Sequence, residues 1–354
     1  MSAPGGVPCA RPSERGQVTP ASLWLSIFLA GFVVIAGLLL QTLLTPIPYG
    51  DLARIGRISD HDFGWRDAQP HVAPAELEGV PVAEADILVI GDSFSATHVW
   101  QSRLQRAGYG VATVFWDSLD ERLCGDFGRW LVGPGFRGKL VIVESVERFV
   151  AIRMGHMQAC ERMDKPLSAP AAQRARPSEQ VPAFALNWDA QLISGWLTAR
   201  CTRAAVAGRV DSECDSQAVA RPVEDGCKRF SHRHCNSALF LAGDLDLGEM
   251  TPGHAAQMHA FNRAQSPLPI LWMVVPNKWT AYLAPAHSQA FVTEFVRRDL
   301  GPDLFAFAQA QKARLRDFYY PNDTHISTQG QLALGERMLQ SVRQKLGAVE
   351  PDGG

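Results

Sequence analysis

An uncharged run of 22 residues, Leu23–Leu44, constrains this 354-residue chain more than any other feature. At a rise of about 1.5 Å per residue, a helix of this length crosses the hydrocarbon core of a bilayer, which is roughly 30 Å thick. A soluble helix of the same length would need a polar face. No small-residue cleavage site follows before Thr45-Pro46, so the run over residues 23–44 predicts an uncleaved transmembrane signal anchor.

The two sides of the anchor differ in composition. Residues 1–22 are rich in Pro, Gly, Ser and Arg and predict a disordered tail. Arginines lie on both sides of the anchor, so the positive-inside rule does not give its orientation. The cysteines are more informative, because Cys9 lies before the anchor and six lie after it, namely Cys124, Cys160, Cys201, Cys214, Cys227 and Cys235.

An even set of six cysteines is typical of an oxidising compartment and predicts three disulfides. We therefore expect a single-pass protein whose tail is cytoplasmic and whose domain lies in an oxidising, periplasm-like compartment. The alternative is a metal site formed by Cys227, His232, His234 and Cys235, but their spacing matches no standard zinc pattern. We expect disulfides and no metal.

The segments after the anchor predict one large domain behind a linker. Residues 45–85 carry repeated prolines and predict a linker that wraps onto the domain. From 86 to 347, apolar runs alternate with helical segments, which indicates an α/β fold with a parallel sheet flanked by helices, a three-layer flavodoxin-like arrangement. Proline, alanine and cysteine clusters break this alternation at about 150–240 and predict a disulfide-rich insertion, while residues 348–354 form a tail.

The charge of the chain excludes one class of partner. The formal net charge is −2 and no block of basic residues occurs, so nothing indicates nucleic-acid binding.

A serine directly follows the first predicted strand, Ile87–Ile90, in the segment Gly91-Asp92-Ser93-Phe94-Ser95. Open α/β sheets bind ligands at the carboxyl ends of their strands. A serine hydroxyl becomes a nucleophile when an imidazole takes its proton and a carboxylate holds the imidazole in the right tautomer. Asp323 and His325 provide those two groups near the C-terminus. The pattern predicts a catalytic triad of Ser93, His325 and Asp323.

Each half of this pattern also has a purely structural interpretation. Asp92, Ser93 or Ser95 would serve equally well as the N-cap of the next helix. Likewise, Pro321-Asn322-Asp323 is a good turn sequence. The co-occurrence of both segments at strand ends favours catalysis.

The order Ser93, Asp323, His325 resembles that of the SGNH, or GDSL-type, hydrolase superfamily, whose nucleophile lies in a Gly-Asp-Ser block after the first strand. Within the superfamily the chain is most similar to the membrane-anchored alginate O-acetyltransferase-like branch, which modifies bacterial exopolysaccharides. The similar features are the Asp-Ser-Phe-Ser segment followed by Trp100, the Asp-x-His spacing, and Val275-Pro-Asn-Lys278 with Tyr282.

The chain also departs from the superfamily pattern. Ordinary members carry Asp-x-x-His, and a Gly-x-Asn-Asp block after the third strand, where this chain has Glu144–Arg148 without an asparagine. We therefore expect the oxyanion donors to come from Ser93 and from Asn277, although Asn277 could equally shape a turn. Arg148, Lys278 and Tyr282 are the candidate substrate-binding residues.

The resemblance implies an O-acetyltransferase that transfers acetyl groups to a polysaccharide through a Ser-His-Asp acyl-enzyme mechanism. It also implies a location in the bacterial inner membrane with the catalytic domain in the periplasm, and a multispanning membrane-bound O-acyltransferase as partner. The expected mechanism needs no cofactor. Three alternatives stay open: a polysaccharide or lipid O-deacetylase or esterase, a non-catalytic scaffold of an exopolysaccharide export complex, and a disulfide-rich binding module.

Overall fold

The computed structural model describes residues 19–45, 50–64, 67–165, 167, 186–188, 194–209, 214 and 217–347. Most of the predicted cytoplasmic tail, all of the predicted C-terminal tail, and most of the proline-rich part of the predicted insertion lie outside these residues.

Four parallel strands form the central sheet, which confirms the predicted parallel α/β architecture. They are β1 (Ile87–Gly91), β2 (Val111–Phe115), β3 (Leu140–Val146) and β6 (Ile270–Val275), in the spatial order β2-β1-β3-β6. Strand β2 lies on one side of β1 and β3 lies on the other, so the chain runs outward from β1 to β2 and then crosses back over β1 to β3. The carboxyl end of β1 is therefore a topological switch point, where open α/β sheets bind ligands.

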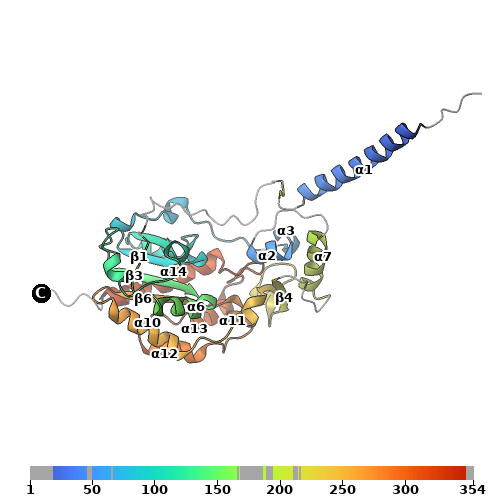
Figure 1. Cartoon of the computed structure of the whole chain (residues 1–354). Coiled ribbons are helices and arrows are strands. Elements are labelled where there is room, and N and C mark those ends of the chain that lie inside the picture. The colour runs from blue at the N-terminus through green and yellow to red at the C-terminus, as the bar shows by residue number, and fades with distance from the viewer. Residues whose placement is uncertain are drawn as a thin grey trace, which may run out of the picture.

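Helices cover both faces of this sheet (Figure 1). Strand residues alternate between two cores, so that Leu88 and Ile90 face one layer while Ile87 and Val89 face the other. Burial on both faces explains why the strands are continuous apolar runs. The first layer contains α6 (Glu147–Gln158), α10 (Pro252–Ala264) and α12 (Gln289–Arg297), and the second contains α4 (Gln101–Arg106), α13 (Leu304–Arg314) and α14 (Thr328–Gly347).

The α-helix after β1 does not begin directly at the end of the strand. It is α4, which starts at Gln101. A short 3₁₀ turn, η3 (Ser93–Ser95), comes first, and His98 then adopts a left-handed backbone with φ of 56°. Because a left-handed residue interrupts a right-handed helix, regular α-helix resumes only beyond it.

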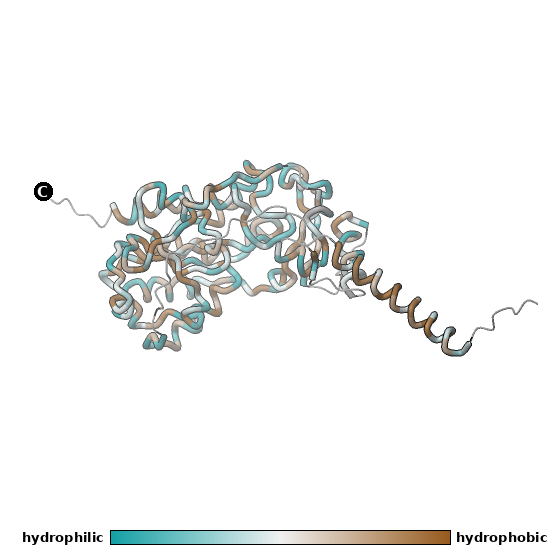
Figure 2. Tube along the Cα trace, turned by 90° about the horizontal axis from the view of Figure 1, so that it is seen from above, coloured by the Kyte–Doolittle hydropathy of each residue, from teal (hydrophilic) through white to brown (hydrophobic). Residues whose placement is uncertain are grey.

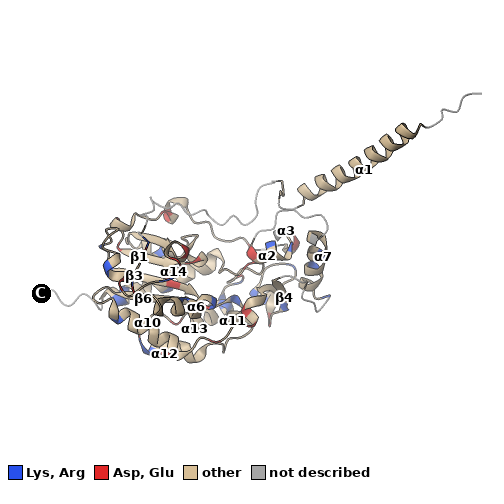
Figure 3. Ribbon diagram, viewed as in Figure 1, with Lys and Arg blue, Asp and Glu red and all other residues tan. Residues whose placement is uncertain are grey.

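Helix α1 (Pro20–Leu43) is long and apolar enough to cross a membrane, as the sequence predicts. None of its residues is buried, and its first and last turns carry no charged side chain. Figure 2 shows it as hydrophobic along nearly its whole length, and Figure 3 shows it without charged residues. Among the described residues it is the one helix with this property.

The segment after the anchor packs onto the domain through two short helices, α2 (Asp51–Gly56) and α3 (Asp60–Phe63). Leu52 and Phe63 are fully buried and join a small core with Leu239. Leu239 belongs to the insertion, where β4 (Ala218–Pro222) and β5 (Ser237–Leu241) form an antiparallel hairpin beside α7 (Ser194–Val206). The remaining short elements are η1 (Pro74–Leu77), η2 (Val82–Glu84), η4 (Trp116–Leu119), α5 (Phe127–Trp130), α8 (Gly226–Arg229), α9 (Ala242–Leu245) and α11 (Lys278–Tyr282).

The six cysteines after the anchor form three disulfides, as predicted. The pairs are Cys124–Cys160, Cys201–Cys214 and Cys227–Cys235. Pairing of Cys227 with Cys235 removes two of the four ligands of the alternative metal site. Of that set, His232 and His234 are left.

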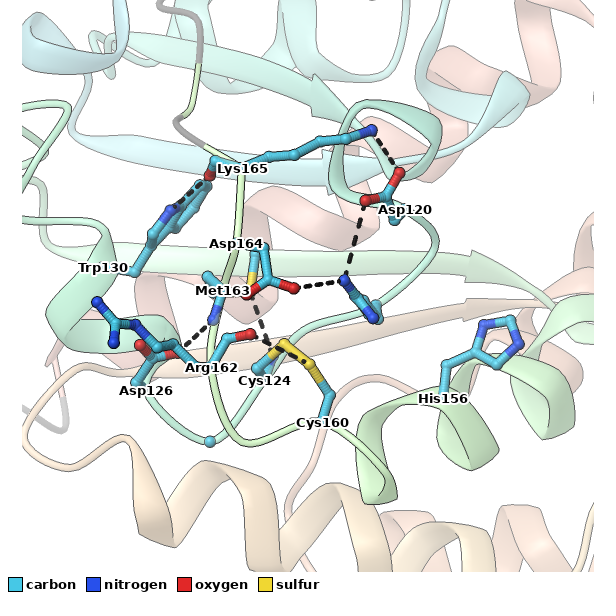
Figure 4. Close-up of a disulfide and its surroundings, with 12 residues drawn as sticks. Asp120, Cys124, Asp126, Trp130, His156, Cys160, Arg162, Met163, Asp164 and Lys165 are labelled. Carbon is cyan, nitrogen blue, oxygen red and sulfur yellow. Dashed lines mark hydrogen bonds and ion pairs between the residues drawn. A yellow bond between two sulfur atoms is a disulfide. The ribbon is translucent and has the colours of Figure 1, made fainter.

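The Cys124–Cys160 disulfide joins the loop after β2 to the end of α6 (Figure 4). The chain after Cys160 is held against the same loop by hydrogen bonds. The Met163 N–H donates to Asp126 Oδ1 over 2.8 Å, and the Trp130 indole donates to the Lys165 carbonyl over 2.8 Å. The disulfide thus ties the start of the predicted insertion to the sheet.

Candidate active site

The turn after β1 exposes Ser93 by burying its neighbours. A Cβ on Gly91 would lie 2.5 Å from Ser95 Oγ, so only glycine permits this close approach. The Asp92 carboxylate accepts hydrogen bonds from the Phe94 N–H over 3.1 Å and from the Val146 N–H over 2.9 Å. Of the three residues that could cap the next helical turn, Asp92 is the one that does so. Ser93 is left exposed at the switch point.

Buried polar side chains hydrogen-bond to the residues on either side of Ser93. Arg153 Nη1 donates to Asp92 Oδ2 over 3.0 Å, and Ser95 Oγ donates to Glu144 Oε2 over 2.9 Å. Burial and the nearby charge of Asp92 raise the pKa of the Glu144 carboxyl well above its usual value. The turn that carries Ser93 is thus fixed by side chains from β3 and α6.

Ser93, His325 and Asp323 meet in the order that a catalytic triad requires. His325 Nε2 lies 2.7 Å from Ser93 Oγ, and His325 Nδ1 lies 2.5 Å from Asp323 Oδ1. The His325 backbone N–H also donates to Asp323 Oδ1 over 2.8 Å. The Phe94 ring packs against the imidazole with 4.8 Å between centroids. The imidazole is therefore held between the serine and the carboxylate with its orientation fixed.

The electrostatics of the triad favour an ionised Asp323 beside a basic His325. Burial lowers the pKa of His325, but the charge of Asp323 and its hydrogen bond outweigh burial and raise it overall. Burial likewise opposes ionisation of Asp323, yet His325 holds the pKa of that carboxyl below its usual range. A base with a raised pKa accepts the serine proton more readily, provided that the pH leaves it neutral.

The loop that carries Asp323 and His325 is held from the insertion side. The Leu239 N–H of β5 donates to the Pro321 carbonyl over 2.8 Å. Lys278 Nζ donates to the Leu239 carbonyl over 2.6 Å and to the Asp323 carbonyl over 3.1 Å. Burial lowers the pKa of Lys278 to about 7. The insertion and α11 thereby position the loop that carries Asp323 and His325.

Asp51 is a fourth polar residue of this site that the sequence did not predict. Its backbone N–H donates to Asp323 Oδ2 over 3.0 Å. Its carboxylate accepts hydrogen bonds from the backbone N–H and the hydroxyl of Thr324 and lies 3.7 Å from His325 Nδ1. Burial and the charge of Asp323 raise the pKa of Asp51. Of the two carboxylates beside His325, Asp323 is therefore the one that ionises more readily.

The residue before Asp51, Gly50, has a conformation and surroundings that only glycine permits. Gly50 has a φ of 81°, and a Cβ there would lie 2.6 Å from the Asn322 carbonyl oxygen. The same carbonyl accepts a hydrogen bond from the Ala53 N–H over 3.0 Å. The first turn of α2 thus binds the loop that carries Asp323 and His325.

Replacing Asp51 with asparagine should shift the pH dependence of catalysis. The carboxylate charge of Asp51 raises the pKa of His325, so its removal should move the midpoint of the pH–rate profile to lower pH. We expect ester turnover at the optimal pH to fall only about tenfold, because asparagine keeps one of the two oxygen acceptors for Thr324. Asp117→Asn, an exposed carboxylate after β2, is the matched control and should leave the midpoint unchanged. An unshifted Asp51→Asn midpoint would contradict this role.

The two candidate oxyanion donors differ in exposure, because Ser93 is exposed and Asn277 is buried. No hydrogen bond from the Ser93 backbone N–H to a described residue is present. Asn277 is fully buried, accepts a hydrogen bond from Arg148 Nε over 3.3 Å and donates its backbone N–H to Glu147 over 2.9 Å. Within the described residues, its Nδ2 has no hydrogen-bond partner. The oxyanion role of both residues stays a prediction.

The three candidate substrate-binding residues differ in accessibility. Arg148 is half-buried, forms an ion pair with Asp244 at 3.0 Å, and its charge lowers the pKa of His325. Lys278 and Tyr282 are buried, with 1% and 7% of their surface exposed. The Tyr282 hydroxyl accepts a hydrogen bond from the Tyr319 N–H over 3.4 Å. Arg148 is thus the least buried of the three, and its charge acts on the imidazole of the triad.

Three side chains of the site also have the geometry to hold a cation. Ligand atoms of Asp51, Asp323 and His325 lie within 4.8 Å of one another. Their atoms already bind each other and Thr324, and a metal on His325 Nδ1 would displace the Asp323 hydrogen bond. The absence of a metal stays a prediction.

A cavity of about 1050 Å³ lies at the opposite edge of the sheet. Its lining includes Tyr109, Gly138 and Pro269, which precede β2, β3 and β6, together with Arg343 of α14. No triad residue contributes to it.

Comparison with known proteins found no family model, no curated protein and no solved structure that matches this chain.

Proposed function

We propose that this chain is a membrane-anchored O-acetyltransferase of the SGNH type that acts on a polysaccharide in the periplasm. The observation that carries the proposal is the pair of short contacts on His325, 2.7 Å to Ser93 Oγ and 2.5 Å to Asp323 Oδ1. An exposed serine at a switch point, with an imidazole and a carboxylate in line, is the arrangement of acyl-transfer enzymes.

The reaction proceeds in two half-reactions on Ser93. In the first, Ser93 Oγ attacks the carbonyl carbon of an acetyl ester while His325 Nε2 takes the hydroxyl proton. The donor alcohol then leaves with that proton, and the acetyl group stays on Ser93. In the second, an acceptor hydroxyl attacks the acetyl-serine and passes its proton to His325. Ser93 Oγ then leaves the acetyl group and takes this proton from His325, which restores the hydroxyl. Asp323 stays ionised throughout and holds the Nδ1 proton.

The negative oxygen of each tetrahedral intermediate needs hydrogen-bond donors. The Ser93 backbone N–H is the first proposed donor, and Asn277 Nδ2 is the second. No cofactor enters this mechanism. The resemblance to exopolysaccharide-acetylating proteins supports a multispanning membrane-bound O-acyltransferase as the partner that supplies acetyl groups.

Hydrolysis is the second candidate function, because Ser93 is exposed. With water in place of the acceptor hydroxyl, the same triad would act as a polysaccharide or lipid O-deacetylase. The two functions differ in the acceptor that resolves the acetyl-serine.

Intact mass spectrometry of the full-length protein should distinguish them. Incubation with an activated acetyl ester should add one acetyl group, and peptide mapping should locate it on Ser93. A hydroxyl-bearing glycan should then remove the adduct faster than buffer and gain the acetyl group itself. The same glycan with its hydroxyls methylated is the matched control. Equal loss in both, with free acetate, would establish hydrolysis, and no adduct or turnover would favour the non-catalytic scaffold.

A further inference from the structure

Four large apolar side chains lie exposed near the point where the anchor enters the domain. They are Leu186, Trp188, Trp196 and Leu197, with exposed fractions of 37%, 76%, 55% and 54%. We call these four residues the aromatic patch. Tryptophan is mostly buried in soluble domains, so two exposed tryptophans in one short stretch need an explanation.

Hydrogen bonds place the patch at the end of the membrane-spanning helix. The Asn187 N–H donates to the Leu43 carbonyl over 2.8 Å, and Asn187 Nδ2 donates to Thr45 Oγ1 over 3.3 Å. Trp188 is the next residue along the chain, so its depth is that of the last turn of α1. Figure 1 shows α7, which carries Trp196 and Leu197, at the end of the body nearest α1, with the C-terminus at the opposite end.

We propose that the aromatic patch inserts into the headgroup region of the bilayer and seats the domain on the membrane surface. Tryptophan prefers this region because its ring is apolar while its N–H reaches water and headgroups. We assign the patch to lipid rather than to a protein partner because the residue before Trp188 is hydrogen-bonded to the end of α1. Tryptophans form aromatic belts at this depth, at the membrane–water interface.

Seating the domain in this way brings the triad close to the membrane. Asp51 follows Thr45 by six residues, and an extended chain spans at most about 3.6 Å per residue, so Asp51 lies within about 22 Å of Thr45, which is two residues beyond α1. Asp51 is itself 3.7 Å from His325. The proposed acyl-transfer site would therefore lie close to the bilayer surface.

Quenching of tryptophan fluorescence by brominated lipids tests this placement. The full-length protein carrying Trp24→Phe, which removes the tryptophan inside α1, would be reconstituted into nanodiscs whose acyl chains are brominated near the headgroup. We expect quenching relative to unbrominated nanodiscs, and loss of most of it when Trp188→Ser and Trp196→Ser are added. Trp100, Trp116 and Trp272 are buried and should contribute little.

Controls separate this result from folding and from catalysis. Trp130→Phe, which alters a half-buried tryptophan at the end of α5, should leave the quenching unchanged. Unchanged thermal unfolding of the Trp188→Ser, Trp196→Ser variant would show that it folds. Ser93→Ala should be quenched like its parent, so the test is independent of the proposed function. No quenching in the parent, or quenching that survives loss of both tryptophans, would overturn the proposal; protection of Trp188 only after adding a membrane protein would assign the patch to that protein.

Discussion

Replacing Ser93 with alanine should lower the turnover of an activated acetyl ester by a factor on the order of 10⁴ to 10⁶. The hydroxyl is the atom that forms the acyl-enzyme, and no other hydroxyl is within hydrogen-bond distance of His325 Nε2 among the described residues. Folding should not change, because Ser93 is exposed and its side chain supports no other group. Initial rates with the ester, together with a thermal unfolding curve, measure both effects.

Ser118→Ala is the matched control for this substitution. Ser118 is also exposed and follows β2 at the same edge of the sheet, but its hydroxyl donates to the Phe115 carbonyl rather than to an imidazole. It should retain full turnover. If Ser93→Ala kept turnover within a few-fold of the wild type, the triad would not be the catalytic group, and the scaffold interpretation would take its place.

The sequence predicted the sheet and the triad because both depend on local patterns. Parallel strands buried on both faces are continuous apolar runs, and the predicted first run, Ile87–Ile90, forms β1 of the sheet. Gly91 and Asp92 are needed for the turn itself, one for space and one as a cap. Ser93 could therefore be located from the chain around it, and the same holds for Asp323 and His325, which are two residues apart.

The rest of the site depends on contacts between distant segments. The hydrogen bond from Asp51 to Asp323 joins residues 272 positions apart, and no periodicity or motif in the linker indicates it. The positions of Lys278 and Tyr282 likewise depend on the insertion. Placement after β6 predicts proximity to the sheet edge, but β5 and the Pro321 loop cover Lys278, and Phe230 stacks on Tyr282. Which side chains face a ligand was thus decided by packing that the sequence pattern does not encode.

Replacing Asp323 with asparagine should lower ester turnover by about 10⁴-fold. Asparagine can donate its amide hydrogen to His325 Nδ1, which leaves the proton on Nε2, and that nitrogen then cannot accept the proton of Ser93. The main-chain contact from Lys278 to residue 323 would remain, so the loop should keep its position. Steady-state kinetics and an unfolding curve would separate lost catalysis from lost structure.

The same variant should also change the pH dependence, with a sign fixed by the charges around the imidazole. In the wild type, turnover should rise as pH increases through the pKa of His325, because the neutral imidazole is the base, and this pKa is raised above its ordinary value of 6.5. Asp323 contributes more to that increase than Asp51 does. The midpoint should therefore move to lower pH in both asparagine variants, and further in Asp323→Asn than in Asp51→Asn. A titration of the His325 ring by NMR measures the shift without relying on residual activity. The reverse order would mean that Asp51 is the carboxylate that orients the base, because the residue with the larger effect on the imidazole is the one that holds its proton.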